Sequence, residues 1–157
     1  MKNIINKFND EQMKEINKGF EKGLTDEQIA IYTKPEFNWE QMMEIRLGLE
    51  NNLDVSIYAR PDFPFWLMEE IRVGLGEGLD VSVYAKTEFN LAQLIQIRMG
   101  LEKRLDVSVY AHPVFSWRQM EQIRKGLEEN LDVSKYAKIS LSWIGMYIAR
   151  MILKIIE

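Results

Sequence analysis

The sequence predicts an all-α fold, an α-solenoid of about five 26-residue helical-hairpin repeats followed by a C-terminal helix. The heptapeptide LDVSVYA occurs at residues 79–85 and 105–111, with near-copies at 53–59 and 131–137. A phenylalanine precedes each copy at the same 26-residue spacing. Self-similarity at such a period is typical of arrays in which each unit buries its apolar face against its neighbours.

We expect the repeats to form one domain over residues 1–157. Its units are expected at residues 8–36, 37–62, 63–88, 89–114 and 115–140, with a terminal helix at 141–157. The first unit is longer than the others because LTDEQIAIY stands where later units have the shorter LDVSIY. With 46% apolar residues, the chain can build a substantial core.

The start of each long helix is predicted from its cap. In the second unit Asn38 is a good N-cap, Gln41 is its capping-box partner, and Phe37 and Met42 can form a hydrophobic staple. The same arrangement recurs at Phe8/Asn9/Gln12/Met13, Phe89/Asn90/Gln93/Leu94 and Phe115/Ser116/Gln119/Met120. A helix of about 13–14 residues should follow each cap.

The leucine of LDVSxYA is predicted to close the long helix, directly after a residue with left-handed backbone. Glycine or asparagine occupies that position at Gly23, Asn52, Gly78 and Asn130. Arg104 is the exception, and we expect a mildly strained helix end there. The aspartate that follows the leucine should cap a short second helix, which a proline or another breaker ends.

Glycine recurs within the long helix and tyrosine within the short one. A mid-helix glycine costs about 1 kcal/mol relative to alanine, so we expect another backbone, that of an adjacent short helix, to approach closely. The tyrosines are expected in the core, with their hydroxyls hydrogen-bonded.

An arginine recurs near the middle of the apolar arc of the long helix. The column comprises Arg46, Arg72, Arg98, Arg124 and Arg150, with Asn17 in the first unit. Because a buried unpaired charge is very costly, each arginine needs a partner, and we expect a capping aspartate, a repeat tyrosine or short-helix carbonyls. The alternative is a basic ladder along a groove that binds an acidic partner or phosphate.

The third unit departs from the repeat at its cap. Pro64 replaces the capping residue and Leu67 replaces its glutamine partner. The change brings Trp66 and Leu67 onto a sector that is polar in the second unit. We expect this exposed pair either to contact a neighbouring unit or to anchor a protein partner.

The terminal helix departs further, because isoleucines take the place of polar residues on its outer sector. They are Ile144, Ile148, Ile152 and Ile155, where the second unit has Glu40, Glu44, Gly48 and Asn51. A terminal unit normally presents a polar outer face. We expect self-association into a two-fold homodimer. The alternatives are cover by another part of the chain, attachment to a membrane surface, or a longer natural chain.

Composition excludes several classes of function. The net charge of −4 argues against a broad electrostatic grip on nucleic acid. The lack of cysteine rules out disulfides and thiolate metal sites, and fits a reducing, cytoplasmic location. No apolar run at the start suits a secretory signal, and the last helix is too short for a comfortable membrane span.

No motif indicates chemistry. His112 is the single histidine and occupies a variable loop position, while carboxylates such as Glu69 and Glu70 follow the repeat. Nucleotide-binding, hydrolase and zinc-protease patterns are missing from the sequence. We therefore expect no enzymatic activity, no cofactor and no dedicated metal site.

The string EQMMEIRLGLENNLDVSIYARPDF resembles a short two-helix repeat of uncharacterised proteins from Firmicutes and their phages, plasmids and other mobile elements. The resemblance covers about residues 8–157 and implies an α-helical repeat protein from a mobile element. Small acidic proteins of that origin are often inhibitors of host defence, including anti-CRISPR proteins.

The expected function is a non-enzymatic protein–protein interaction scaffold that forms a homodimer through its C-terminal helix and binds a protein of unknown identity. The alternative is an inhibitor of a host nucleic-acid-processing or defence enzyme, with Trp66 at its docking surface. A third interpretation is the phosphate- or nucleic-acid-binding arginine groove.

Overall fold

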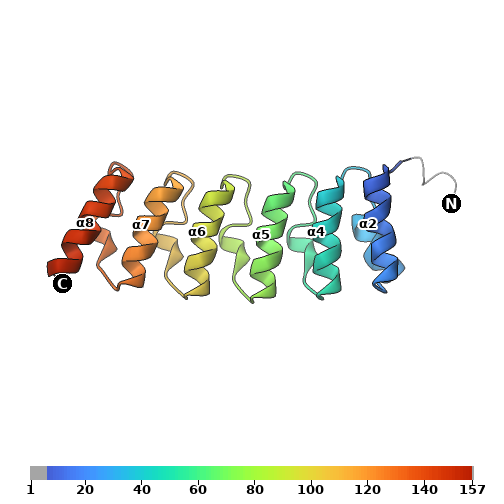
Figure 1. The fold of residues 1–157 in the computed structure, drawn as a ribbon, viewed down its shortest axis with the longest axis horizontal. Helices are drawn as coiled ribbons and strands as arrows, with labels where there is room; N and C mark the ends of the chain where they lie inside the picture. Colours follow the sequence, from blue (N-terminus) through green and yellow to red (C-terminus); the bar gives the residue numbers. More distant parts are fainter. Residues whose placement is uncertain (1–6, 157) are drawn as a thin grey trace. The chain divides into compact units, whose positions relative to one another are not determined.

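The structure, a computed structural model that describes residues 7–156, is all-helical within that range (Figure 1). The α-helices are α2 (Asp10–Glu21), α3 (Asp26–Tyr32), α4 (Trp39–Glu50), α5 (Phe65–Gly76), α6 (Leu91–Glu102), α7 (Trp117–Glu128) and α8 (Trp143–Ile156). Four 3-10 helices join them: η1 (Val55–Ile57), η2 (Val81–Val83), η3 (Val107–Val109) and η4 (Val133–Lys135). The all-α class is thus confirmed. Glu157, the last residue of the predicted terminal helix, lies outside the described residues.

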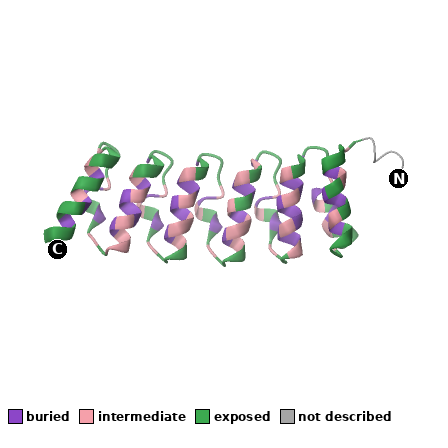
Figure 2. Cartoon of the chain, in the orientation of Figure 1, coloured by how far each residue is buried: buried purple, intermediate pink, exposed green. Residues whose placement is uncertain are grey.

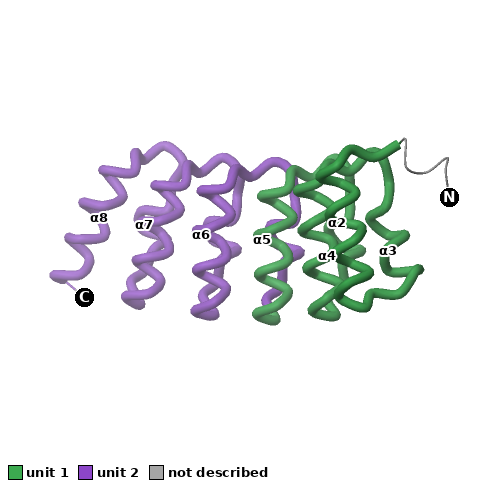
Figure 3. Tube along the Cα trace, turned by 45° about the vertical axis from the view of Figure 1, so that its right-hand side comes forward, with its two compact units in different colours: residues 1–78 green, residues 79–157 purple. Residues whose placement is uncertain are grey.

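The chain divides into two compact units, residues 1–78 and 79–157 (Figure 3). In the first unit α4 packs between α2 and α5, and α3 lies against α2 and α4. In the second unit α7 packs between α6 and α8. Consecutive long helices therefore pack against each other, as a helical repeat requires. The assignment of one domain over residues 1–157 remains a prediction.

The predicted caps are present at the starts of the long helices. Capping boxes join Asn9 to Gln12, Asn38 to Gln41, Asn90 to Gln93 and Ser116 to Gln119. Pro64, as expected from its missing side-chain acceptor, makes no side-chain cap. Helices α2, α4, α5, α6 and α7 each contain 12 residues, slightly fewer than predicted.

The left-handed backbone predicted just after each of the first five long helices is confirmed. Positive φ angles occur at Gly23, Asn52, Gly78, Arg104 and Asn130. In α4 the residue after the left-handed one closes the helix, because the amide of Leu53 donates to the carbonyl of Gly48 at 2.9 Å. Arg104 has a φ of 58°, so the predicted strain of a non-glycine residue in this region is present.

The short second helix is a single 3-10 turn in four repeats and the α-helix α3 in the first. The aspartates Asp54, Asp80, Asp106 and Asp132 cap these turns by accepting from a serine amide two residues later. The turns η1, η3 and η4 place Tyr58, Tyr110 and Tyr136 against the preceding long helix, and the tyrosine of every turn is buried. The short helix thus serves mainly to deliver a tyrosine to the core.

The repeated glycines make room for these tyrosines. A Cβ added at Gly48 would lie 1.9 Å from the hydroxyl oxygen of Tyr58, and one at Gly126 would lie 1.8 Å from that of Tyr136. The close approach was predicted, but the group that approaches is a side chain of the same repeat rather than a backbone of an adjacent one. Any residue larger than glycine would displace the tyrosine.

Candidate interaction surface

Arg46 and Arg72 in the first unit, and Arg124 and Arg150 in the second, lie between consecutive long helices of their own unit, where they are paired. The Nε of Arg46 donates to Glu15 at 2.9 Å, and that of Arg72 donates to Glu44 at 2.7 Å. In the second unit the corresponding acceptor is a glutamine. Arg124 donates to Gln96 at 3.0 Å and Arg150 to Gln122 at 3.3 Å.

A glutamate one helical turn further along binds the outer edge of several guanidinium groups. Arg46 pairs with Glu50, Arg98 with Glu102, and Arg124 with Glu128. Arg150 instead reaches Glu129 at 2.7 Å. The expected partners, namely capping aspartates, repeat tyrosines and short-helix carbonyls, were therefore wrong, whereas the structural interpretation of the column is supported.

The sequence analysis did not predict these partners because it misjudged which way the acceptor side chains point. The helical wheel placed Gln41, Glu44 and Gly48 on a face directed away from the core, yet all three are buried. That face receives the next long helix as well as the short helix of the same repeat. Polar residues are tolerated there because the next arginine and the next loop satisfy them.

Burial and pairing shift the pKa values of these side chains. Burial raises the pKa of Glu44, and the hydrogen bond from Arg72 only partly opposes it. Burial alone would lower the pKa of Arg46, but hydrogen bonds to Glu50 and Glu15 raise it. A guanidinium group held in this way is not available to a phosphate, so the arginines do not form an open basic ladder.

The capping glutamines have a second role that the sequence did not reveal. The side-chain amide of Gln41 donates to the carbonyls of Pro61 at 3.1 Å and Phe63 at 2.6 Å, in the loop before the next long helix. Gln93 makes the same pair of bonds to Pro113 and Phe115 at 3.0 and 2.7 Å. One side chain thus caps its own helix and fixes the next loop.

Helix α8 exposes the largest run of apolar side chains in the described chain. The exposed fractions of the predicted isoleucines are 52% for Ile144, 52% for Ile148, 53% for Ile152 and 82% for Ile155. Only Met146, Arg150 and Leu153 are buried, on the side that packs against α7. Figure 2 shows the same distribution, with most of α8 coloured as exposed.

Four further residues widen this surface, and the sequence analysis missed them. Trp143, Tyr147, Met151 and Ile156 are also exposed. Trp143, Tyr147 and Met151 are spaced by four residues, beside the isoleucines, and Ile156 follows Ile155 at the end of the helix. We call these eight residues together the α8 face.

The edge of the α8 face carries one charged side chain with a partner. Lys154 donates to Glu129 at 2.8 Å, and the same carboxylate accepts from Arg150. These two cations lower the pKa of Glu129. The α8 face is therefore close to neutral as well as apolar.

The exposed Trp66–Leu67 pair is not formed. Leu67 is fully buried and Trp66 is partly buried. Leu67 occupies the helix position at which Gln41 and Gln93 are also buried, so its burial follows the repeat. The prediction that Trp66 and Leu67 form an exposed anchor for a partner was therefore wrong.

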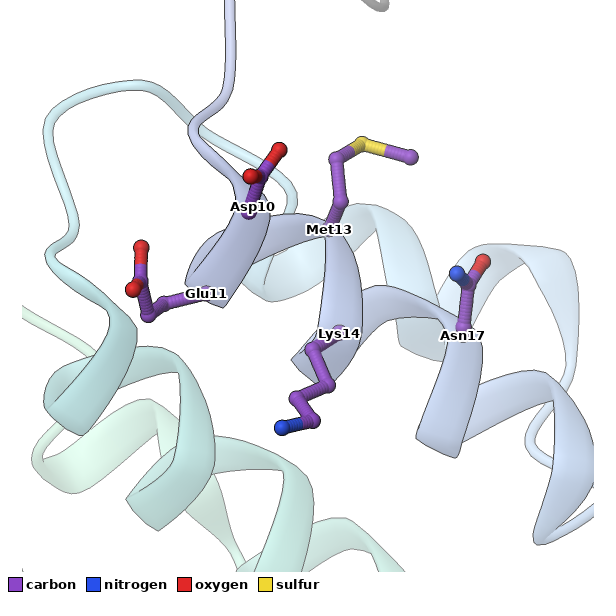
Figure 4. A pocket seen from close by; sticks show the side chains of 5 residues that line it. All are labelled: Asp10, Glu11, Met13, Lys14 and Asn17. Atoms are coloured by element: carbon purple, nitrogen blue, oxygen red, sulfur yellow. The ribbon is translucent and has the colours of Figure 1, made fainter.

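The surface of the first unit carries shallow hollows. One of about 310 Å³ is lined by Asp10, Glu11, Met13, Lys14 and Asn17, all from α2 (Figure 4). Another of about 280 Å³ lies beside Phe20 and Ile29, and a third of about 380 Å³ lies between the ends of α2 and α4. None gathers a set of side chains with an evident catalytic geometry.

Within residues 7–156, no group of three or more His, Cys, Asp or Glu side chains is arranged to hold a metal ion. No helix in that range is long and apolar enough to cross a membrane.

Comparisons with protein-family models, curated proteins and solved structures found no match. The function must therefore be argued from the surfaces described above.

Proposed function

We propose that this chain is a non-enzymatic protein–protein interaction scaffold that self-associates through the α8 face. The observation that carries the proposal is the exposure of eight large apolar side chains on one helix. Contiguous apolar surface rimmed by polar residues is characteristic of protein–protein contacts.

The energetic case follows from the exposed fractions. Fully burying a side chain such as isoleucine stabilises by about 1.5–3 kcal/mol relative to leaving it exposed. Because Ile144, Ile148 and Ile152 are about half exposed, a partner that covers them recovers a good part of that energy at each position. The same holds for the aromatic side chains Trp143 and Tyr147, which contribute large contact areas at interfaces.

The recurrent polar residues support the non-enzymatic part of the proposal. Arginines, glutamates and glutamines at fixed repeat positions pair with one another between successive helices, as Arg46 does with Glu15 and Arg124 with Gln96. These side chains act as structural links between repeats. A cytoplasmic location belongs to the same proposal.

The alternative of a mobile-element inhibitor stays a proposal with less support. Its suggested anchor was the Trp66–Leu67 pair, and Leu67 is buried. An inhibitor would have to dock through another surface, and the α8 face is the candidate that the structure offers.

Light scattering coupled to size-exclusion chromatography tests the self-association. We expect the wild-type mass to rise from monomer towards dimer between about 1 and 100 μM, the range in which contacts of this kind are populated. Ile148→Glu should keep the chain monomeric, because it places a charge in the centre of the α8 face.

Val114→Glu is the matched control. Val114 is an apolar residue of the same unit, 62% exposed and distant in sequence from α8, so this variant should associate like the wild type. A wild-type chain that stays monomeric at 100 μM would contradict the proposal. So would association that Ile148→Glu leaves unchanged while circular dichroism shows both variants folded.

A further inference from the structure

Each junction between long helices of the same unit depends on three positions of the earlier helix. The third residue is a glutamine that binds the next loop, the sixth accepts from the next arginine, and the tenth is a glycine that admits a tyrosine. In α4 these are Gln41, Glu44 and Gly48, whose contacts to Phe63, Arg72 and Tyr58 are described above.

The second unit uses the same three positions. In α7 they are Gln119, Gln122 and Gly126. Gln119 donates to the carbonyl of Leu141 at 2.9 Å, Gln122 accepts from Arg150, and Gly126 admits the tyrosine hydroxyl. The junction between α7 and α8 thus has every element of the junction between α4 and α5.

Helix α8 has none of these three groups. Its third, sixth and tenth residues are Gly145, Ile148 and Ile152. A following repeat would meet no acceptor for its buried arginine, because Ile148 stands where α4 has Glu44 and α7 has Gln122. The side chain of Ile152 would also occupy the space that the repeat tyrosine needs. The α8 face therefore cannot receive another repeat of this type.

The first helix of another copy is also a poor match. At the arginine position α2 carries Asn17, and Asp10, Lys14 and Asn17 are all exposed on that helix (Figure 4). Stacking this surface against isoleucines would bury amide and charged groups without partners. Head-to-tail assembly is therefore disfavoured.

The α8 face of a second copy needs none of the junction groups that α8 lacks, and it brings no polar surface such as that of α2. An isologous contact places a surface against itself, so a patch with net charge would repel its own copy. The α8 face is apolar, and the charge of Lys154 at its edge is compensated by Glu129. Opposed isoleucines can interdigitate without leaving a polar group unsatisfied.

We infer that the occupant of the α8 face is the α8 face of a second copy of this chain, paired by two-fold symmetry, so that association stops at the dimer. This inference rests on the proposed function and specifies its partner. A helix of 14 residues is about 21 Å long. The exposed face of one helix of that length offers less area than the roughly 800 Å² per partner of a standard interface, so the dimer should exchange rather than be permanent.

The absence of cysteine from the sequence makes cross-linking a clean test. Full-length Ile148→Cys, incubated at 100 μM with a short bis-maleimide, should give a covalent dimer. Thr87→Cys, on an exposed loop of the same unit, serves as the control and should give at least tenfold less. An equimolar mixture of Ile148→Cys with a larger, tagged Asn17→Cys should give no cross-link between the two species.

The outcomes separate the two proposals. A cross-link between Ile148→Cys and Asn17→Cys, or masses beyond the dimer in light scattering, would overturn the two-fold pairing while leaving self-association intact. A monomer at every concentration would overturn both. A dimer that Ile148→Glu abolishes, but in which Ile148→Cys cross-links no more than Thr87→Cys, would also reject the α8–α8 contact.

Discussion

The hydroxyl of Tyr58 donates a 3.1 Å hydrogen bond to the carbonyl oxygen of Glu44, across the gap that Gly48 leaves in the surface of α4. The same bond recurs in the second unit between Tyr110 and Gln96, at 3.0 Å. Each repeat thus closes on itself through one aromatic side chain and one missing Cβ.

Replacing Gly48 with alanine should therefore destabilise the chain. The new Cβ would lie 1.9 Å from the Tyr58 hydroxyl and 2.8 Å from a methyl carbon of Val55. Overpacking of this kind costs about 1–3 kcal/mol, which outweighs the gain of about 1 kcal/mol in helix propensity. Urea unfolding followed by circular dichroism measures the difference.

Gly76→Ala is the matched control for this prediction. Gly76 is also helical, but nothing lies within 4 Å of the position that its Cβ would occupy. The substitution should leave stability unchanged or raise it by up to about 1 kcal/mol. Equal effects at the two positions would show that the tyrosine contact does not require glycine.

The buried tyrosines should make the fold sensitive to alkali. Burial raises the pKa of Tyr32 and of Tyr136 to about 12, against an unfolded value of about 10. Because the folded pKa is raised, the stabilisation is complete below pH 10 and is lost as the pH rises through 12. Unfolding free energies should be level from pH 8 to about 10 and should then fall progressively towards pH 12, with tyrosinate absorbance rising in parallel.

The double variant Tyr32→Phe/Tyr136→Phe checks the cause. It should be less stable than the wild type at pH 8, by roughly 1 kcal/mol for each hydrogen bond lost. Its stability should nevertheless fall less steeply between pH 10 and 12. A slope identical to that of the wild type would assign the alkaline loss to other groups.

Glu44, the buried carboxylate that accepts from Arg72, leads to a second prediction about pH. Burial raises the pKa of Glu44 above its unfolded value of about 4.3, so its contribution to stability is greatest below that value and is lost as the pH rises through the folded pKa. Glu44→Gln copies the arrangement of Gln96 with Arg124 and should remove this dependence. The difference in unfolding free energy between variant and wild type should therefore increase, in favour of the variant, from pH 4 to pH 7.

Glu44→Ala distinguishes pairing from charge. It leaves the guanidinium group of Arg72 without its acceptor on α4, so it should cost about 1–3 kcal/mol relative to Glu44→Gln. Denaturant unfolding at pH 7 measures this gap. If alanine were tolerated as well as glutamine, the acceptor position would not hold the arginine.

Gln93→Ala should cost more than the loss of an ordinary helix cap. The side chain completes the capping box of α6 and also donates to two carbonyls of the next loop. We expect a loss of about 1–3 kcal/mol in unfolding free energy, since buried carbonyls lose a donor as well. Gln28→Ala, in the exposed capping box of α3, should cost no more than about 1 kcal/mol.

The sequence was sufficient for the helices and their ends because those depend on local chemistry. Caps such as Asn38 and left-handed residues such as Asn52 act within a few residues of where they stand. Even the strained helix end at Arg104 could be predicted from the repeat, since the residue at the equivalent position of every other unit is glycine or asparagine.

The partners of the arginines could not be obtained in the same way. They depend on which face of one helix meets the next, and a helical wheel of Trp39–Glu50 gives no reason to bury Gln41 and Glu44. Hydrophobicity assigned these polar residues to solvent, whereas their burial depends on donors from the following repeat. The buried position of Leu67 was misjudged for the same reason.

The α8 face was predicted in part. Its isoleucines were conspicuous because they replaced polar residues of other repeats, and they are exposed as expected. Trp143 escaped notice because the second to fifth units carry an apolar residue at its position, and Tyr147 and Met151 because the second and fourth units do. Departure from a repeat is thus easier to detect than exposure that the repeat shares.

Gln119 of α7 binds the loop before α8, whereas α8 itself has Gly145 at the equivalent position. This difference has an evolutionary implication. Because the junctions within each unit reuse the same positions for a glutamine donor, an arginine acceptor and a glycine, recombination between repeats could add or delete a whole module without redesigning those that remain. Helix α8 lacks these groups. Homologous chains of different lengths should therefore vary in their number of such modules while keeping a helix with the isoleucines of α8.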